Sequence, residues 1–237
     1  AAKIAGLREL DVDVIGLLRF NPSMVAMPAE AFVRAVLVAK LHAREVWVGP
    51  DFRFGHRRGG DVALLQRMGA ELGFATQALH LVEDAGERVS STAVRAALAN
   101  ADFDRAAVLL GRPYAIPGRV VRGKQLGRTL GYPTANLRFG GRRPPMHGIF
   151  ATWVHGVEDR PMASVSSLGT RPTVNGKEPL LEAHLFDFSG DLYGRRISVE
   201  FVGKLRDELK FDGLPALIEQ MDRDSAEARA ILLDRPH

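Results

Sequence analysis

The feature that most constrains the fold is a change in sequence pattern near Gly111. Before it, amphipathic helical stretches alternate with short apolar runs, a pattern typical of βαβ units around a parallel sheet. After it, Gly and Pro separate short runs of alternating apolar and polar residues, as in an antiparallel barrel or sandwich. We therefore predict two domains: an α/β domain over residues 1–111 and a β-rich domain over residues 112–237 that ends in a helix.

The same patterns predict individual elements. In the first domain, apolar runs predict buried strands at residues 13–20 and 44–49, and amphipathic spacing predicts helices at residues 28–43 and 61–73. In the second domain, alternation predicts strands, and apolar residues at helical spacing over residues 214–233 predict a terminal helix. The strands predicted there cover residues 119–123, 148–156, 180–188 and 195–205.

Composition limits the class of protein. Of the 237 residues, 46% are hydrophobic, and the absence of cysteine excludes disulfides, thiolate metal sites and a cysteine nucleophile. No apolar run approaches the roughly 20 residues of a membrane span, and the amphipathic start is unlike a secretory signal. We therefore expect a cytoplasmic protein with no membrane partner. The net charge of +4 favours anionic partners, which include nucleotides and nucleic acids.

Residues 90–95 combine hydroxyl groups with an arginine at the expected start of a helix. Ser90, Ser91 and Thr92 would lie near free backbone N–H groups, with Arg95 one turn further on. Such a helix start can bind phosphate. Capping by serine is common at helix starts and explains the same residues without any ligand.

A glycine-rich basic segment runs from Gly118 to Arg128 in the second domain. Its glycines allow close approach of the backbone, and its cations could neutralise phosphate. The spacing is not that of a P-loop, and a strand–turn–strand hairpin would explain the glycines equally well. The candidate phosphate-binding residues are Gly118, Arg119, Gly123, Lys124, Gly127 and Arg128.

Thr134 and Asn136 stand two positions apart in an expected extended segment, directly after Pro133. Alternation along a strand directs both side chains to the same side, so a hydroxyl and an amide carbonyl would lie next to each other. Neutral oxygen ligands of this kind help to hold hard cations such as Mg²⁺. The pair is therefore a candidate magnesium site.

Glu182 and His184 share one face of the strand predicted at residues 180–188. A carboxylate there could accept a proton from a substrate hydroxyl. Exposed Glu and His residues are also ordinary on the solvent side of a half-buried strand, and we interpret His184 as structural.

Taken together and in order, several segments resemble the bifunctional bacterial riboflavin kinase and FAD synthetase family over essentially the whole chain. They are VGPDFRFG, VSSTAVRAAL, LLGRPYAIPGRVVRGKQLGRTLGYPTANL, LGTRPTV, LEAHLFDF, DLYGRRISVEF and LRDELKF. The resemblance implies a Rossmann-like nucleotidyltransferase domain that adenylylates FMN to FAD. It also implies a second domain, an antiparallel β-barrel that phosphorylates riboflavin to FMN with ATP and Mg²⁺.

The resemblance also implies roles for individual residues. Thr134 and Asn136, in the PTAN motif, would hold Mg²⁺ and the ATP phosphates, and Glu182 would be the general base for the ribityl 5′-hydroxyl. The segment from Gly118 to Arg128 would form a flexible loop over the nucleotide. Phosphoryl transfer depends mainly on positioning and charge neutralisation, so these parts form a sufficient set. The residues implied on the flavin side, with the terminal helix, are Arg206 and Phe211.

The sequence departs from the family pattern at two places. None of its seven histidines forms the H-x-G-H motif whose histidines contact the ATP phosphates during adenylyl transfer, so we expect a partial nucleotidyltransferase domain. In SSLGTRPT, Ser167 stands where the family usually has asparagine. We expect that change to be tolerated because serine can still form hydrogen bonds.

Two other functional classes are compatible with parts of the sequence. A non-catalytic flavin- or nucleotide-binding module would bind without turnover, which the presence of Thr134, Asn136 and Glu182 argues against. A nucleic-acid-binding protein would account for the basic charge and the GGRRPP stretch, but only 7% of residues are aromatic and no RNA-binding motif is recognised. We expect riboflavin and ATP as partners and no nucleic acid; the sequence carries no signal for an oligomeric state.

The lack of an H-x-G-H motif leads to a first prediction. Supplied with FMN, ATP and Mg²⁺, the 237-residue chain should form no FAD, although it should form FMN from riboflavin. The reason is that losing even one positioned donor to a transition state costs about 10² to 10³ in rate. Chromatographic separation of FMN and FAD measures both steps, and FAD formation at a rate comparable to the kinase step would contradict the prediction.

Overall fold

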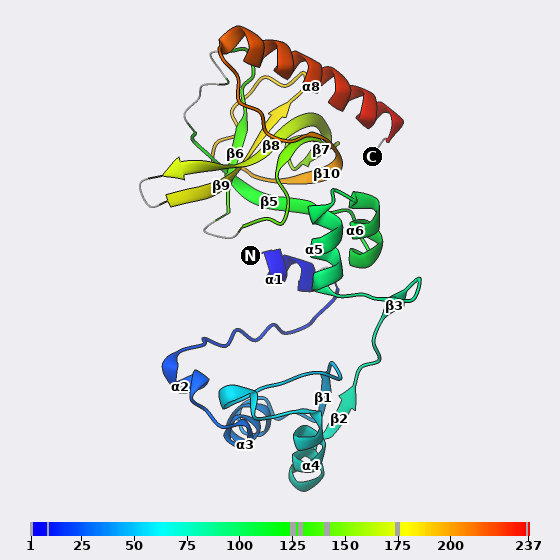
Figure 1. Ribbon diagram of the computed structural model, residues 1–237. Helices are drawn as coiled ribbons and strands as arrows, with labels where there is room; N and C mark the ends of the chain where they lie inside the picture. Colours follow the sequence, from blue (N-terminus) through cyan, green and yellow to red (C-terminus); the bar gives the residue numbers. More distant parts are fainter. Residues whose placement is uncertain are drawn as a thin grey trace. The chain divides into compact units, whose positions relative to one another are not determined.

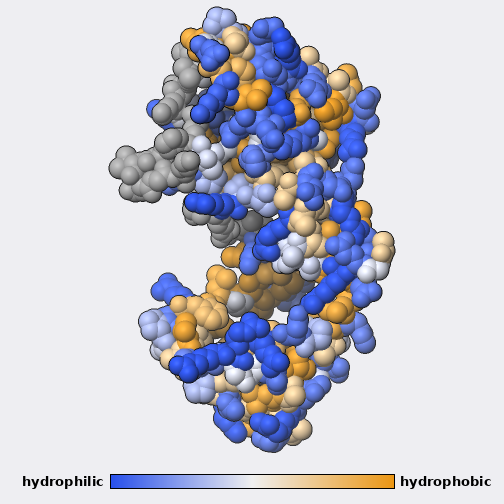
Figure 2. Space-filling view, in the orientation of Figure 1, coloured by the Kyte–Doolittle hydropathy of each residue, from blue (hydrophilic) through white to orange (hydrophobic). Residues whose placement is uncertain are grey.

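The computed structural model describes residues 2–8, 10–123, 127, 130–139, 143–173, 176–235 and 237. The chain forms two compact units, Ala1–Arg88 and Val89–His237 (Figure 1), each with its own hydrophobic core. Hydrophilic and hydrophobic residues are interspersed on the face shown in Figure 2. The domain boundary predicted at Gly111 falls inside the second unit, and the assignment of residues 1–111 to one domain stays a prediction. Among the helices of the described ranges, none combines the length and apolar character needed to cross a membrane.

The first unit is built around a parallel pair of strands, β1 and β2, with α4 between them in sequence. This confirms the predicted parallel arrangement. Helix α4 begins where the Asp61 side chain accepts a hydrogen bond from the Leu64 N–H (2.9 Å), and it ends at Gly73, whose φ of 81° is left-handed. The elements are α1 (Ala2–Arg8), α2 (Pro22–Val25), α3 (Ala29–Phe32), η1 (Val33–Val38), β1 (Glu45–Val48), η2 (His56–Arg58), α4 (Val62–Leu72), β2 (Ala75–Ala78), β3 (Glu83–Asp84) and β4 (Glu87–Arg88).

The helix predicted at residues 28–43 forms only in part. Helix α3 continues into the π-helical segment η1, which ends at Val38, and His42 then has a left-handed φ of 48° that a helix does not accommodate. The buried side chain of Val33 packs in the core of the first unit with Leu65 and Met68 of α4.

The strand predicted at residues 13–20 is wrong. These residues form no regular element and are largely exposed, with 83% exposure at Val14 and 82% at Phe20. A strand needs a neighbouring strand to satisfy its backbone N–H and C=O groups. Within the described part of the first unit, β1 pairs only with β2 and β3 only with β4. Apolar composition therefore predicted a strand in a segment that has no partner strand.

The second unit is a closed antiparallel barrel with strand order β10-β5-β6-β9-β8-β7, and β7 pairs with β10 to close it (Figure 1). This confirms the predicted barrel and its terminal helix. Gly and Pro between short alternating runs predicted an antiparallel barrel or sandwich, and the family resemblance implied the barrel. The elements are α5 (Ser91–Ala99), α6 (Phe103–Leu110), β5 (Ala115–Val121), β6 (Ala135–Arg138), β7 (Gly148–His155), β8 (Met162–Thr173), β9 (Gly176–Leu185), β10 (Arg196–Arg206) and α8 (Leu214–Asp234).

Alternate side chains of the strands fill the barrel. On β7, the inward residues Phe150, Thr152 and Val154 are fully buried. The Phe150 ring packs edge-to-face against Phe201 of β10, with centroids 5.2 Å apart, and against Phe103 of α6, with centroids 5.9 Å apart. Helix α6 therefore shares the core of the barrel.

Helix α8 packs on the outside of the barrel (Figure 1). Ala228 and Leu232 of the helix form a second buried cluster with Ala151 of β7 and Phe186, which follows β9. This packing holds the second half of α8 on the barrel, and the first half of the helix forms one wall of a pocket.

Candidate active site in the barrel

A pocket of about 380 Å³ lies beside α8. This volume is within the range of small-molecule sites. Its walls come from the segment before β6, from β8, β9 and β10, from the residues after β10, and from α8, so segments far apart in sequence meet there. The lining residues are Gly127, Leu130, Tyr132, Thr134, Ile149, Val165, Ser166, Ser167, Glu182, His184, Arg206, Glu208, Leu209, Phe211, Leu217, Met221, Asp224 and Ser225.

Strand pairing brings three of the predicted polar residues together. The register pairs Asn136 of β6 with Glu182 of β9, and Glu182 in turn with Ser167 of β8. Residues directly paired on neighbouring strands share one face, with Cβ atoms about 5 Å apart. Glu182 is half-buried and lines the pocket, as does Thr134. The predicted metal pair and the predicted base thus occupy one site.

The Asn136 amide is buried, with 5% exposure. Its Nδ2 donates to the Thr134 carbonyl oxygen (3.1 Å) and to Thr134 Oγ1 (3.3 Å), which fixes the amide orientation because a carbonyl can only accept. Within the described ranges, Asn136 Oδ1 has no hydrogen-bond partner. An unsatisfied buried acceptor costs about 1–3 kcal/mol. Asn136 Oδ1 is therefore suited to receive a cation.

Two glycines of the basic segment come close to this region. A Cβ atom at Gly123 would lie 2.7 Å from Asn136 Oδ1, and a Cβ atom at Gly127 would overlap the Tyr132 carbonyl oxygen. Side chains at these positions would crowd the site, so both glycines serve close backbone approach.

Tyr132 and His184 close one side of the pocket. Their ring centroids are 4.9 Å apart, His184 Nδ1 lies 2.9 Å from the Pro133 carbonyl oxygen, and the Tyr132 hydroxyl donates a hydrogen bond to Asp222 of α8. Burial, together with the hydrogen bond to Asp222, raises the pKa of the Tyr132 hydroxyl, which therefore stays protonated. These contacts hold the segment that carries Thr134.

Arg206 and Phe211, both predicted on the flavin side, lie together on the pocket wall. Arg206 donates from Nε and Nη2 to the two carboxylate oxygens of Asp224, at 2.8 and 2.5 Å, and Asp224 is only 4% exposed. Gln220 donates to the same carboxylate at 2.9 Å. The guanidinium carbon lies 5.8 Å from the centre of the Phe211 ring. The charge of Arg206 is therefore balanced by α8, and its ion pair ties the helix to the barrel.

A second pocket, of about 660 Å³, shares Thr134 with the first and includes Asn136. Val120 and Arg122 belong to the segment predicted to cover the nucleotide, whereas sequence reasoning assigned no role to the lining residues from Leu185 to Tyr193. The Arg122 guanidinium lies 5.2 Å from the centre of the Tyr193 ring, which is an attractive cation–π geometry. The lining residues are Val120, Arg122, Pro133, Thr134, Ala135, Asn136, Leu185, Phe188, Ser189, Gly190, Asp191, Leu192 and Tyr193.

Gly118 and Arg119 line neither pocket. They belong to β5 and not to a loop, which corrects the expectation of a flexible segment beginning at Gly118. A Cβ atom at Gly118 would lie 2.5 Å from Leu137 Cδ2, and Arg119 donates to the Gly194 carbonyl oxygen at 2.6 Å. Packing within the barrel accounts for both residues.

In the described part of this segment, only residues 118–121 belong to a strand, and both explanations of its glycines, a hairpin turn and a phosphate-binding loop, stay predictions. Strands β5 and β6 pair antiparallel, with Val120 opposite Leu137 and Val121 opposite Asn136. The connection between these strands includes Gly123 and Gly127. The predicted phosphate contacts Lys124 and Arg128 lie outside the described residues.

The helix start at residues 90–95 is a capped N-terminus. Ser90 Oγ accepts a hydrogen bond from the Ala93 N–H (3.1 Å), and Arg95 donates to the Ser91 carbonyl oxygen (3.1 Å) of its own helix. Ser90 therefore caps the helix, as the alternative interpretation of these residues predicted. A phosphate site formed by Ser90, Ser91, Thr92 and Arg95 stays a prediction.

Comparison with protein families divides the chain into two matched segments. The family described as riboflavin kinase matches residues 110–232, which include the described barrel strands, the lining of both pockets and most of α8. The family described as FAD synthetase matches residues 1–93. A bifunctional riboflavin kinase/FMN adenylyltransferase from Escherichia coli K12 is 44% identical over 227 residues, covering 96% of this chain and 72% of that protein. The chain belongs to this family.

Other similar proteins support the same assignment. The bifunctional riboflavin kinase/FMN adenylyltransferases of Pseudomonas fluorescens and Haemophilus influenzae are 45% and 40% identical, covering 95% and 96% of this chain and 73% and 74% of those proteins. A crystal structure described as a macrolide-efflux protein from Streptococcus pneumoniae is 29% identical, with a TM-score of 0.77, covering 96% of this chain and 73% of that one. The resemblance inferred from the motifs is thereby confirmed.

In this member of the family, the sequence carried one signal for a pocket residue that was not recognised. Met221, Asp224, Ala228 and Leu232 recur at helical spacing along α8. A carboxylate within an apolar helical stripe indicates a buried partner, which the structure shows to be Arg206. Tyr132 carried a weaker signal, its position directly before the PTAN motif.

The buried ion pair leads to a stability prediction for this family member. Replacing Arg206 with Met should destabilise the second unit by about 3–5 kcal/mol, because the Asp224 carboxylate would stay buried without its cation. Adding Asp224→Leu should recover much of that loss, because it removes the unpaired charge. Urea unfolding can be followed by Trp153 fluorescence in a Trp47→Phe background, since the two tryptophans lie in different units.

A matched control lies on the same helix. Arg223 pairs with Glu219 at the surface, with side-chain exposures of 64% and 66%. Replacing Arg223 with Met should therefore cost less than about 1 kcal/mol. Equal losses for the Arg206 and Arg223 variants would show that the Arg206 pair does not anchor α8.

Proposed function

We propose that the second unit phosphorylates riboflavin to FMN with ATP and Mg²⁺, with the flavin in the pocket beside α8 and the nucleotide in the pocket that contains Tyr193. The observation that carries this proposal is the position of Thr134, which lines both pockets, beside Asn136 and Glu182. A phosphate passing between two substrates needs a metal and a base where their binding sites meet.

Mg²⁺ fits the polar atoms found at this junction. Asn136 Oδ1 is a buried acceptor without a partner in the described part of the chain, and the Thr134 hydroxyl lies beside the same amide. Both are neutral oxygen donors, and Mg²⁺ usually takes few protein ligands together with phosphate oxygens and water. When bound, the ion would neutralise charge on the transferred phosphate. Lys124 and Arg128 would add positive charge from the neighbouring segment.

Glu182 is the base in this proposal. Its carboxylate is half-buried between Asn136 and Ser167 on a rigid strand, and it lines the pocket assigned to the flavin. A carboxylate in that position can accept the proton of the ribityl 5′-hydroxyl as the oxygen attacks phosphorus. A barrel strand holds it in place more firmly than a loop would.

The two pockets differ in character as the two substrates require. The first is lined by apolar side chains such as Val165 and Met221 around the Arg206–Phe211 pair, which suits a flat heteroaromatic ring. The second combines the aromatic rings of Phe188 and Tyr193 with Asn136, beside which Gly123 allows close backbone approach, and this suits a base and its phosphates.

The first unit corresponds to the FAD synthetase match, and adenylyl transfer to FMN is the family's second activity. We propose that residues 1–111 form a partial adenylyltransferase domain that keeps a phosphate site at Ser90, Ser91, Thr92 and Arg95 but does not complete adenylyl transfer. A cytoplasmic location and small-molecule partners, without nucleic acid or membrane, are part of the same proposal.

The proposal is tested by a kinase assay on Glu182→Gln. With riboflavin, ATP and Mg²⁺, the unaltered chain should form FMN, and the variant should be slower by about 10² to 10⁴, because a general base contributes that much. Flavin and nucleotide binding should be nearly unchanged. The control is Glu178→Gln, an exposed glutamate on the same strand that lines neither pocket.

Three outcomes separate the alternatives. No FMN from the unaltered chain, with both ligands bound, would favour a non-catalytic binding module. Near-normal turnover by Glu182→Gln would place the base elsewhere. A slow Glu178→Gln variant would show that the loss comes from the strand and not from the pocket carboxylate.

Asn136→Ala tests the metal assignment. In the unaltered chain Mg²⁺ should strengthen ADP binding, and the variant should lose most of this gain, while riboflavin affinity and metal-free ADP affinity change little. Titration calorimetry measures the affinity for riboflavin and the affinity for ADP with and without Mg²⁺. The control is Asn100→Ala, which alters an exposed asparagine that lines neither pocket. If the variant lost affinity for riboflavin and for the magnesium nucleotide equally, the cause would be a folding defect and not the loss of a metal-binding side chain.

A further inference from the structure

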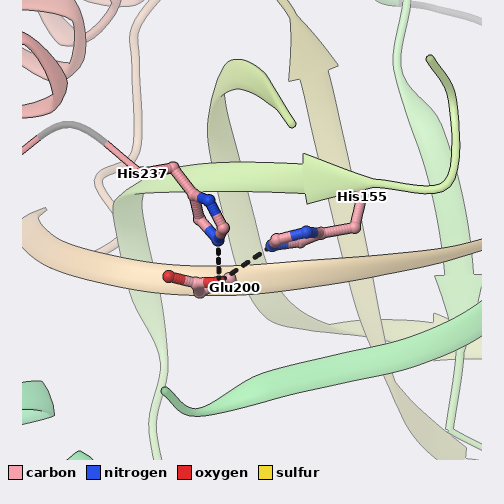
Figure 3. A group of neighbouring side chains, drawn as sticks. All are labelled: His155, Glu200 and His237. Carbon is pink, nitrogen blue, oxygen red and sulfur yellow. Dashed lines mark hydrogen bonds and ion pairs between the residues drawn. The ribbon is translucent and has the colours of Figure 1, made fainter. Parts of the chain in front are cut away.

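A second group of possible metal ligands lies away from both pockets (Figure 3). It consists of His155 at the end of β7, Glu200 on β10 and His237, which follows α8. None of these three lines either pocket, so the proposed kinase chemistry does not account for them.

Strand pairing and helix packing explain why these residues meet. The β7–β10 register pairs His155 with Ser198 and Trp153 with Glu200, which makes His155 and Glu200 diagonal neighbours on one face. Helix α8 then returns the chain to this face, where the His237 ring lies 4.8 Å from the His155 ring and 6.4 Å from the Trp153 ring.

The end of α8 is itself held in place. Arg235 donates two hydrogen bonds to the Asp104 carboxylate of α6, both at 2.9 Å. This pairing holds Arg235, two residues before His237 in the sequence, against α6.

The ligand atoms already face one another. Glu200 Oε2 lies 2.8 Å from His155 Nε2 and 3.4 Å from His237 Nε2, and the three ligand atoms lie within 4.8 Å of one another. Ligands at about 2.0–2.2 Å from a tetrahedral ion are about 3.4 Å apart, so small rotations of these side chains would suffice. The Glu200 side chain is only 13% exposed, and its ion-pair partners in the described ranges are the two histidines, with no lysine or arginine.

We propose that His155, Glu200 and His237 form a binding site for a divalent transition-metal ion, with Zn²⁺ as the best fit. Two imidazole nitrogens and one carboxylate oxygen are donors that Zn²⁺ accepts, with a water molecule completing a tetrahedral set. Mg²⁺ fits poorly because it prefers oxygen ligands throughout. The ion would join β7 and β10 to His237, three residues beyond the end of α8, and so would stabilise the packing of that helix.

The direct test measures Zn²⁺ binding to untagged protein by competition with a chromophoric chelator. The unaltered chain should bind one Zn²⁺ at this site, and His155→Asn and His237→Asn should each weaken binding by at least about tenfold, since even changes beyond the ligands cost about 10- to 100-fold. His80→Asn, which alters an exposed histidine in the first unit, should bind like the unaltered chain. Equal Zn²⁺ affinity in all four proteins would overturn the proposal.

Two further measurements guard against misfolding as the cause. Zn²⁺ should raise the melting temperature of the unaltered chain but not that of His237→Asn, and Mg²⁺ should not reproduce the effect. Both proteins should form FMN at the same rate in Mg²⁺ alone, since His237 lines neither pocket. If the unaltered chain gains no stability from Zn²⁺, the three residues are a hydrogen-bonded cluster and the proposal is wrong.

Discussion

The pairing of β6 with β9 is the constraint on which the rest of the site depends. It sets Asn136 opposite Glu182, and because β9 is also paired with β8, Glu182 is fixed from both sides. A shift of one residue in either pairing would turn these side chains to the opposite face, into the apolar interior. The barrel closes on itself, so such a shift in one pair would disturb its neighbours. The position of the proposed base is thus a property of the whole barrel.

Much of the fold could be predicted because the two halves have different hydrophobic periods. Alternation in segments such as that of Phe150, Thr152 and Val154 predicts a strand with one buried face, and amphipathic spacing over residues 61–73 predicts the helix observed at Val62–Leu72. Residues 13–20 show the limit of this reasoning. An apolar run indicates that burying the segment would be favourable. The same run carries no information on whether a partner strand is available to pair with it.

Some features of the candidate site could likewise be predicted from local sequence, and others could not. Thr134 and Asn136 could be placed together because a strand period of two relates them, but their meeting with Glu182 depends on pairing between distant segments. The family resemblance predicted that these residues form one site. It also predicted that Gly118 and Arg119 belong to a flexible loop, whereas both lie in β5. The Arg206–Asp224 pair and the second pocket depend on how α8 and the barrel pack, which no local pattern describes.

Closure of the barrel also affects the self-association of this protein through its strand edges. Where the strands close the barrel, each has a neighbour on both sides, so the backbone there offers no template for pairing with another chain. Within the part of the chain that the structure describes, the β8–β9 hairpin is paired only within itself beyond Leu168 of β8 and before Leu180 of β9. The first unit differs: in the described residues, β1 and β2 each pair on one side only, and the exposed apolar side chains of Val14 and Phe20 belong to the same unit. Resistance to self-association through strand edges therefore differs between the two units, and both pockets lie in the unit that contains the barrel.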